Sequence, residues 1–289
     1  MTIEKKLLGT SPSGGAANVA EVFSTFLYTG AGGTQTITNG IDLSGEGGLV
    51  WVKHRTAAIA HMLVDTERGV KRSISSNTSA AQTPANANNV DAFYSTGFQV
   101  GPDGSTNQPN GKFVSWTFRK KKKFFDIVTW TGNDTAGRTI PHNLGSVPAM
   151  MLVKMTNGTY SWNVYHSGIG ATKFLELDTN NGGQTSSAVW NNTAPTDSVF
   201  TVGQEYGVNQ GSKTYVAYLF ADNSSEGADD QMIKCGSFTT DGSGAAFVNL
   251  GWEPQFLLTK KSNGTAAWVI LDRMRGFPTK GIDNAKLSP

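Results

Sequence analysis

Two copies of the pattern D-x-x-R-G contain the residues whose types and spacing could do chemistry. They read "DTERG" from Asp65 and "DRMRG" from Asp272. An aspartate that opens a turn can accept hydrogen bonds from the amides of that turn, and a nearby arginine can pair with its carboxylate. A carboxylate can also bind calcium or a glycan. The first interpretation predicts that Asp65 with Arg68, and Asp272 with Arg275, fix two turns; the second predicts two ligand sites.

A run of five cations is the one strong charge feature. It comprises Arg119, Lys120, Lys121, Lys122 and Lys123, in "RKKKKFF". Lysines are common in solvated linkers and on edge strands, where they prevent further strand pairing. The run could instead face an anionic partner, such as lipopolysaccharide, capsule or an acidic subunit. Neighbouring cations repel one another, so both interpretations require counter-charge in solvent or in a partner.

Tryptophans are the candidates for stacking on sugars. Trp190 lies in the polar stretch "AVWNNTAP", which predicts a loop and therefore an exposed aromatic platform. Trp162 and Trp268 follow the same apolar stretch in two copies of a repeat, which favours core packing. Trp190 is therefore the residue through which the chain would bind a glycan.

Catalytic patterns are missing from the sequence. It contains no G-x-S-x-G, P-loop, H-E-x-x-H or C-x-x-C pattern. The single cysteine, Cys235, is expected to be a buried, inert thiol. No two histidines have the spacing of metal ligands; they are His54, His61, His142 and His166. We therefore expect no enzyme activity, no catalytic residue, no bound metal and no cofactor.

Charge and hydropathy exclude other classes of function. The net charge is +2, so no strongly basic surface for nucleic acid is expected. No apolar run approaches the length of a membrane helix or of a signal-peptide core. We expect a chain that is made in a cytoplasm and does not insert into membranes.

The scaffold that positions these residues is an internal repeat. The stretch "NLGSVPAMMLVKMTNGTYSW" from Asn143 returns as "NLGWEPQFLLTKKSNGTAAW" from Asn249, with ten of twenty positions identical. The endings "LVWVK", "MMLVK" and "FLLTK" align at Lys53, Lys154 and Lys260. A second half, "FQVGPDGSTNQPNGKFVSWTF" followed later by "FTVGQEYGVNQGSKTYVAYLF", occurs twice. Repeats of this kind indicate one structural unit used several times.

The repeat divides the chain into an N-terminal anchoring segment, 1–23, and three units. Units 1 and 2 span 24–121 and 124–222, and unit 3, 231–289, has only the first half of the pattern. A half unit leaves apolar faces uncovered. Either the sequence is the N-terminal portion of a longer polypeptide, or residues 231–289 complete a sheet of unit 1 or unit 2.

Short strands are predicted throughout. "FVSWTF" and "TYVAYLF" alternate, while "GLVWVKH", "AMMLVKM" and "QFLLTKK" are continuous apolar runs typical of strands buried on both faces. "NGT" at 157–159 and 263–265 indicates hairpins. Helix is expected only within 14–27, and the polar segment 73–92 is expected to be a variable surface loop. Evenly spaced strands predict tandem β-sandwiches or jelly rolls.

The residues "FFDIVTWTGNDTAGRTIPHNLGSVPAMMLVK", "WNVYH" and "GWEPQFLLTK" resemble repeats of tail-fibre-like structural proteins of marine and cyanobacterial tailed phages. The resemblance covers about 24–289. It implies concanavalin- or laminin-G-like sandwiches, a virion component without enzyme activity, and contact with the host surface. It defines no binding residues.

The expected function is therefore that of a tail fibre or adhesin, located in the virion tail. Segment 1–23 would dock onto a tail or baseplate protein, and the chain would form a homo-oligomer, a trimer by analogy with phage fibres. The alternatives are a lectin that binds a host-surface glycan and a protein that decorates the capsid or tail.

Overall fold

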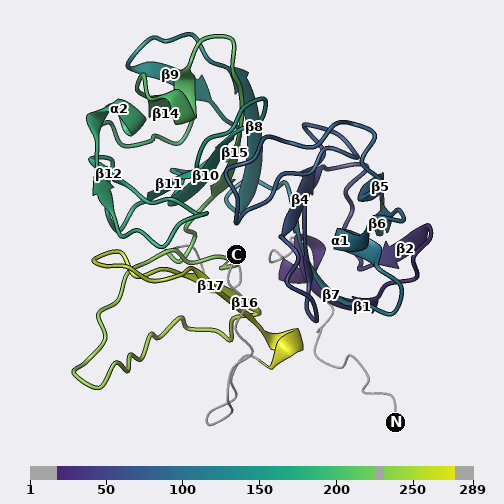
Figure 1. Cartoon of the computed structure of the whole chain (residues 1–289). Coiled ribbons are helices and arrows are strands. Elements are labelled where there is room, and N and C mark those ends of the chain that lie inside the picture. Colours follow the sequence, from purple (N-terminus) through teal and green to yellow (C-terminus); the bar gives the residue numbers. More distant parts are fainter. Residues whose placement is uncertain (1–17, 226–230, 277–289) are drawn as a thin grey trace, which may run out of the picture.

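The computed structural model describes residues 18–225 and 231–276, and nearly all of its regular structure is antiparallel β-sheet. The predicted all-β class is confirmed. The anchoring segment expected at 1–23 falls mostly outside the described residues, as does the last part of unit 3, 277–289. Figure 1 shows two larger blocks of strands with a smaller yellow hairpin beside them.

Unit 1 is built on a four-stranded sheet in the order β1-β7-β3-β4. A three-stranded sheet, β2-β6-β5, covers one face of it, and the two together form a small sandwich. The elements are η1 (Val19–Glu21), β1 (Phe23–Thr29), β2 (Gln35–Thr38), β3 (Gly48–His54), β4 (Met62–Asp65), β5 (Val90–Tyr94), β6 (Gly97–Val100), α1 (Gly104–Asn107) and β7 (Lys112–Arg119).

Unit 2 repeats this arrangement with the strand order β8-β15-β10-β11, and the pair β14-β9 covers it. In both units the last strand of the unit lies between its first and third strands. The elements are β8 (Phe125–Thr131), β9 (Arg138–Pro141), β10 (Met150–Met155), β11 (Asn163–His166), β12 (Lys173–Phe174), β13 (Gln184–Thr185), α2 (Ser187–Trp190), β14 (Val199–Val202), α3 (Tyr206–Asn209) and β15 (Thr214–Phe220).

The strand register is also repeated. Trp51 of β3 pairs with Trp116 of β7, and Leu152 of β10 pairs with Tyr218 of β15 at the equivalent position. A shift of one residue would move every side chain to the other face of the sheet. The equal registers therefore give the two sheets the same division of residues between their faces.

Each four-stranded sheet is buried on both faces. On β7, Phe113 points into the core that lies inside unit 1, whereas Trp116 and Phe118 point into a larger cluster shared with the other units. On β15, Tyr215 and Tyr218 divide in the same way. This explains why the central strands are continuous apolar runs: neither of their faces meets water.

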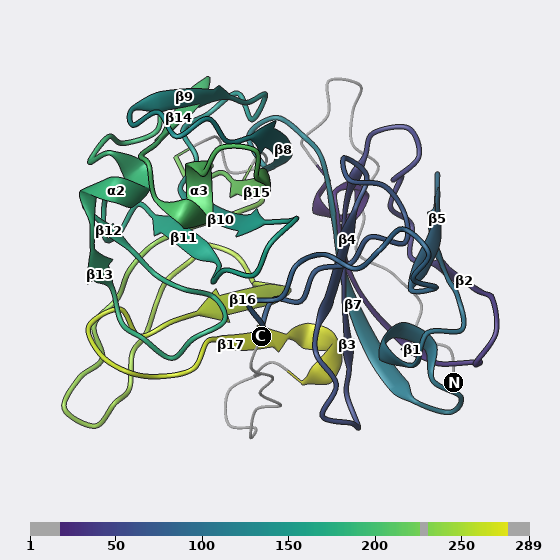
Figure 2. The same cartoon turned by 45° about the horizontal axis from the view of Figure 1, so that its top comes forward.

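Unit 3 consists of β16 (Phe256–Thr259), β17 (Val269–Asp272) and η3 (Arg273–Arg275). Its hairpin forms a sheet of its own, so the alternative in which 231–289 completes a sheet of unit 1 or unit 2 is wrong for the described residues. The hairpin is the counterpart of β3-β4 and β10-β11. Trp268 and Ile270 enter the shared cluster, and Figure 2 shows the hairpin below the boundary of the two larger blocks.

Two local predictions differ from the structure. The helix expected within 14–27 is only one 3-10 turn, η1, before β1 begins at Phe23. β-Branched and aromatic residues such as those of "FSTFLYT" favour a strand when a sheet can bury them. Residues 73–89 of the segment 73–92 form a loop, and 90–92 belong to β5. Part of the loop packs against unit 2 instead of lying open to solvent.

Candidate functional site at the junctions between units

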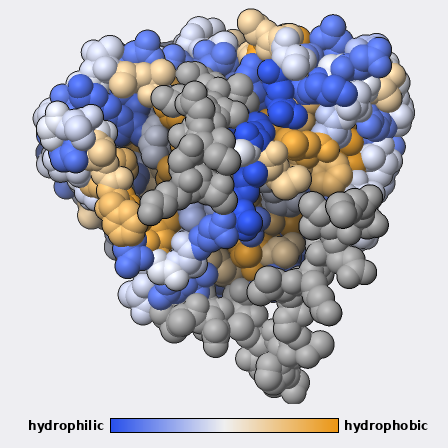
Figure 3. Space-filling view, turned by 90° about the horizontal axis from the view of Figure 1, so that it is seen from below, coloured by the Kyte–Doolittle hydropathy of each residue, from blue (hydrophilic) through white to orange (hydrophobic). Residues whose placement is uncertain are grey.

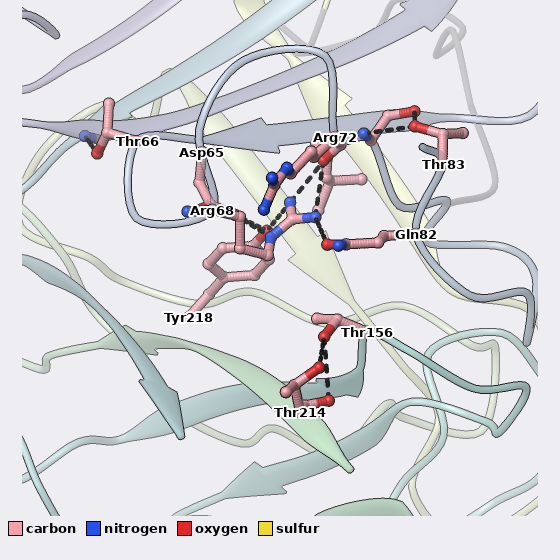
Figure 4. A network of polar contacts seen from close by, with 12 residues as sticks. Asp65, Thr66, Arg68, Arg72, Gln82, Thr83, Thr156, Thr214 and Tyr218 are labelled. Carbon is pink, nitrogen blue, oxygen red and sulfur yellow. Dashed lines mark hydrogen bonds and ion pairs between the residues drawn. The ribbon is translucent and has the colours of Figure 1, made fainter. Parts of the chain in front are cut away.

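Asp65 holds its turn in the way the D-x-x-R-G pattern predicts. Its Oδ1 accepts the backbone amide of Arg68 at 2.8 Å, and its Oδ2 accepts Arg68 Nε at 2.6 Å. Gly69 closes the turn at a φ of 86° and donates its amide to the Asp65 carbonyl. A residue other than glycine would be strained at this backbone angle. The carboxylate is fully buried, and its Oδ2 also accepts the hydroxyl of Tyr218, from unit 2, at 2.8 Å (Figure 4).

The remaining donors of Arg68 are satisfied as well. Nη2 donates to the Leu63 carbonyl and to the Tyr218 hydroxyl, each at 3.1 Å, and Nη1 donates to the Arg72 carbonyl at 2.7 Å. Although burial opposes it, the charge of Asp65 raises the pKa of Arg68, and burial raises the pKa of Tyr218 well above its usual value. Tyr218 therefore stays protonated and donates. The whole group joins unit 2 to unit 1.

Asp272 and Arg275 repeat this geometry in unit 3. Asp272 Oδ1 accepts the amide of Arg275 at 3.0 Å, and its Oδ2 accepts Arg275 Nε at 2.5 Å. Here the donor from a neighbouring unit is Trp116 Nε1 of unit 1, at 3.0 Å from Oδ2. The Arg275 guanidinium also lies 5.2 Å from the centre of the Trp116 ring, within reach of a cation–π contact.

His166 occupies the equivalent position in unit 2. The turn is kept, since the amide of Gly170 donates to the His166 carbonyl at 3.1 Å, but Ile169 replaces the arginine. His166 Nδ1 accepts the amide of Gly168, and burial lowers the pKa of His166, with Asp222 opposing. Turn fixation is therefore common to the three units, whereas the aspartate–arginine pair belongs to units 1 and 3.

A second set of contacts joins unit 2 to unit 1 through a buried lysine and a tryptophan. Lys154 Nζ donates to the carbonyls of Ser79 at 3.1 Å and Met155 at 2.9 Å. Trp162 Nε1 donates to the Ser75 carbonyl at 2.9 Å. Both acceptors on unit 1 lie in the loop 73–89, between β4 and β5, so this loop is a surface for the next unit.

Two backbone hydrogen bonds complete this junction. The amide of Tyr160 donates to the Ser79 carbonyl at 3.0 Å, and the amide of Gln82 donates to the Thr156 carbonyl at 2.9 Å. Backbone pairing between the two units fixes their relative register, which side-chain contacts alone would leave adjustable.

The lysine, tryptophan and backbone contacts of this second set recur, bond for bond, between units 3 and 2. Lys260 Nζ donates to the carbonyls of Asn180 and Lys261, and Trp268 Nε1 donates to the Glu176 carbonyl at 2.8 Å. The two backbone bonds also recur: Ala266 N to Asn180 O at 3.0 Å, and Gly183 N to Ser262 O at 2.7 Å. The donors and acceptors of the two junctions occupy equivalent positions in the repeat.

These contacts give the three units a cyclic order. Tyr218 of unit 2 reaches Asp65 of unit 1, and Trp116 of unit 1 reaches Asp272 of unit 3. Trp268 of unit 3 donates to the Glu176 carbonyl of unit 2, which closes the cycle. Each unit therefore touches both others, and their inward faces share one apolar cluster.

The four lysines of the cationic run, 120–123, lie between the central strand β7, which ends at Arg119, and the edge strand β8. Lys120 Nζ lies 2.6 Å from Glu67 Oε1 and 3.5 Å from Asp126 Oδ1. Although burial opposes it, these carboxylates raise the pKa of Lys120. Part of the expected counter-charge is therefore supplied inside the chain.

The rest of the run divides between backbone pairing and exposure. Arg119 ends β7 and is half-buried, and Lys121 exchanges backbone hydrogen bonds with Phe125. The side chains of Lys122 and Lys123 are exposed. Contact of the run with an anionic partner stays a prediction that concerns these last two residues.

The prediction that Trp190 is an exposed stacking platform is wrong. Trp190 is only 1% exposed and lies in the core of unit 2, with its ring edge-on to Tyr165 at 6.0 Å. The polar sequence around it forms the short helix α2, which Ser186 caps through its side chain. The helix turns Trp190 inward together with Val189, while residues 191–194, which follow it, are exposed.

The cysteine is not fully buried, since the Cys235 side chain is partly exposed. Burial nevertheless raises the pKa of the Cys235 thiol to about 12, so it is protonated and a poor nucleophile at neutral pH. Among residues 18–225 and 231–276, no cluster of three or more metal-ligating side chains occurs.

Sequence reasoning missed the junction residues that belong to no D-x-x-R-G copy. They are Lys154, Trp162, Lys260 and Trp268, with the aromatic donors Trp116 and Tyr218. The signal was present, because the lysine at the end of each apolar run recurs in all three units. A charged residue that recurs at the end of a buried strand indicates a fixed partner.

Lys154 should make stability depend on pH. Burial lowers the pKa of Lys154 to about 8, with Asp178 opposing, from 10.5 in the unfolded chain. Below about pH 8 both states carry the proton, and the cost of burying the charge is present in full. Between these two pKa values only the unfolded state retains it, so stability rises with pH by about 3 kcal/mol.

Urea titrations of the natural chain and of Lys154→Met, at about pH 7 and about pH 10.5, measure this effect. The stability difference between the two proteins should shift by about 3 kcal/mol in favour of the natural chain at the higher pH. Lys260→Met is the matched control, because Lys260 is more exposed and should show a smaller shift. Parallel pH profiles for the natural chain and Lys154→Met would contradict the prediction.

The fold and the junctions define a class of protein in which homologous all-β units are joined by a repeated polar and aromatic interface. The chain belongs to the family described as domain of unknown function DUF7483, whose model matches residues 18–289. The match spans all three units, so the family domain is the block of three and not a single unit. No curated protein and no solved structure matches the chain. No helix within the described part of the chain has the length and apolarity needed to cross a membrane.

Proposed function

We propose that this protein is a structural component of a phage tail, a fibre or adhesin module that serves as a spacer and docking surface in host attachment and has no enzyme activity. The observation that carries the proposal is the bond-for-bond repetition of the junction between successive units. Repeated interfaces join copies of one module into a rigid body.

The use of the chemically capable residues supports a structural role. Both oxygens of Asp65 and of Asp272 already accept hydrogen bonds from their turn and from a neighbouring unit. Lys154 is fully buried against carbonyl oxygens. Side chains with these contacts hold the units together and are not accessible to ligands in solvent. The phage assignment itself rests on the resemblance of the repeat sequences to tail-fibre-like proteins.

Location within a particle is the direct test. Antibodies raised against the 289-residue chain should label the tails of tailed particles that carry this gene, as seen by electron microscopy. Labelling of the capsid would favour the decoration alternative. Particles that lack the protein altogether, by both labelling and mass spectrometry, would reject the proposal.

A glycan array separates the structural proposal from a lectin. Trp190 is buried, so the residue that the sequence assigned to sugar stacking is not accessible to a ligand. We expect no saturable, salt-independent glycan binding by the described block. Saturable binding of one glycan at both low and moderate salt would show that the protein is a lectin and that the role of a simple spacer is wrong.

A further inference from the structure

Asparagine followed by glycine is a reactive pair in a polypeptide, and this sequence contains five such pairs. The side-chain amide of the asparagine can react with the backbone nitrogen of the next residue, because glycine has no Cβ to obstruct the approach. A hydrogen bond made by either group has to break before the reaction, which slows it. The five pairs begin at Asn39, Asn110, Asn157, Asn181 and Asn263.

Hydrogen bonds hold four of the five pairs. Asn157 is held twice, since its Oδ1 accepts the amide of Thr214 at 2.9 Å and its Nδ2 donates to the Ser212 carbonyl at 3.3 Å. Three other pairs each have one reactive group in a hydrogen bond of 2.8–3.0 Å: Asn39 Nδ2 to Thr117 Oγ1, Gly111 N to Gln108 O, and Asn181 Nδ2 to Glu176 Oε2.

Asn263 is the exception. It is exposed and lies in the bend between β16 and β17. Neither its side chain nor the amide of Gly264 makes a hydrogen bond with a described residue. Figure 3 shows the underside of the molecule, where the hairpin lies, as a surface of mixed hydrophilic and apolar residues. Both reactive groups are therefore free, and the water that the reaction consumes is at hand.

A cation lies beside the reactive glycine. A Cβ added to Gly264 would be 3.1 Å from Lys261 Nζ. The reaction passes through an anion, first at the glycine nitrogen and then on the side-chain oxygen of the asparagine, and a nearby positive charge stabilises such an anion. A Cβ on Gly158, which follows Asn157, would be 3.8 Å from Lys213 Nζ. The two pairs thus share a neighbouring cation and differ in the hydrogen bonds of the asparagine.

We propose that Asn263 is a site of covalent modification, at which the side chain is converted without an enzyme to aspartate and isoaspartate. The Gly264 nitrogen loses its proton to hydroxide and attacks Cγ of Asn263. The bond between this nitrogen and Cγ forms, the bond between Cγ and Nδ2 breaks, and Nδ2 takes a proton from water and leaves as ammonia. Water then opens the five-membered ring at either of its two carbonyls. The net change is the exchange of ammonia for water.

The modified residue lies between the two backbone bonds that join unit 3 to unit 2. The Ser262 carbonyl accepts the amide of Gly183 at 2.7 Å, and Ala266 donates its amide to the Asn180 carbonyl at 3.0 Å. Isoaspartate lengthens the main chain between Ser262 and Ala266 by a methylene carbon, so the two bonds lose their present alignment. Aspartate leaves the main chain unchanged. Isoaspartate is therefore expected to loosen this junction, whereas aspartate is not.

Peptide mapping by mass spectrometry tests the proposal on the full chain, incubated in mildly alkaline buffer. At Asn263 we expect the mass increase that accompanies replacement of an amide by a carboxylate, with aspartate and isoaspartate separated by chromatography. Asn157 is the matched control within the same chain. It should convert at least about tenfold more slowly, the factor for two hydrogen bonds that have to break first.

Gly264→Ala tests the path of the reaction. The nearest neighbours of a Cβ at this position are the terminal atoms of the Lys261 side chain, which can move aside, so the variant should fold normally. The added Cβ obstructs the approach of the backbone nitrogen and should slow conversion of Asn263 about tenfold.

Hydrogen exchange separates the effects of the two products. The chain that contains isoaspartate should exchange the amides of Gly183 and Ala266 faster than the unmodified chain. Asn263→Asp carries the same charge on an unchanged main chain and should exchange these amides at the original rate.

Three results would overturn the proposal. Absence of conversion at Asn263, or equal rates at Asn263 and Asn157, would show that the free side chain does not make a modification site. An unchanged rate in Gly264→Ala would show that the glycine nitrogen takes no part. Equal exchange in the isoaspartate chain and in Asn263→Asp would show that the modification does not act on the junction.

Discussion

Replacing Asp65 with alanine is expected to lower the free energy of unfolding by about 3–5 kcal/mol, the range for removing one partner of a buried ion pair. The substitution leaves the Arg68 guanidinium buried without its carboxylate and deprives the Tyr218 hydroxyl of its acceptor. Urea denaturation followed by tryptophan fluorescence measures the change.

Two further variants separate the charge from the contact between units. Tyr218→Phe removes only the hydroxyl that joins unit 2 to Asp65 and should cost about 1–3 kcal/mol. The double variant Asp65→Leu/Arg68→Met removes both charges together and should be considerably less destabilised than Asp65→Ala. A loss below about 1 kcal/mol for Asp65→Ala would mean that the pair does not hold the junction.

Trp116→Ala should both destabilise the chain and release unit 3. Trp116 is fully buried, donates to Asp272, and lies 5.8 Å from the Phe256 ring. Loss of a buried tryptophan costs about 3–5 kcal/mol. Because its contacts reach β16 and β17, hydrogen exchange in that hairpin should accelerate more than exchange in β10 and β11.

Trp130→Ala is the matched control for this experiment. Trp130 is also buried, but it packs inside unit 2 on Phe200 and Tyr215. A comparable loss of stability is expected without selective release of the β16-β17 hairpin. If both variants changed exchange in the hairpin equally, Trp116 would not be the specific link between units 1 and 3.

Much of the fold could be predicted because the copies of the repeat can be aligned with one another. The lysines that end three apolar runs, Lys53, Lys154 and Lys260, place β3, β10 and β16 at equivalent positions of the repeat. Alternation in "FVSWTF" separates its two sets of side chains correctly. The alternation could not show that both faces of the sheet are buried, because residues of the other units cover the second face of each sheet.

The site was predicted only where its partners are close in sequence. Asp65 and Arg68 are three residues apart, so the pattern itself specifies their contact. Tyr218 and Asp65 are separated by 153 residues, and no local signal connects them. Trp190 was wrongly predicted to be exposed because its polar neighbours indicated a loop. The single turn of α2 instead directs its side chain into the core.

The cyclic order of the units has a consequence for assembly. Contacts that three separate subunits would have to find by collision are here tethered, so their formation does not depend on protein concentration. Because the three units belong to one chain, the residue at each equivalent position can also differ from the other two. A homotrimer would carry the same residue in all three places, whereas this chain carries aspartate twice and histidine once at equivalent turns. One polypeptide can thus build three different junctions around a common centre.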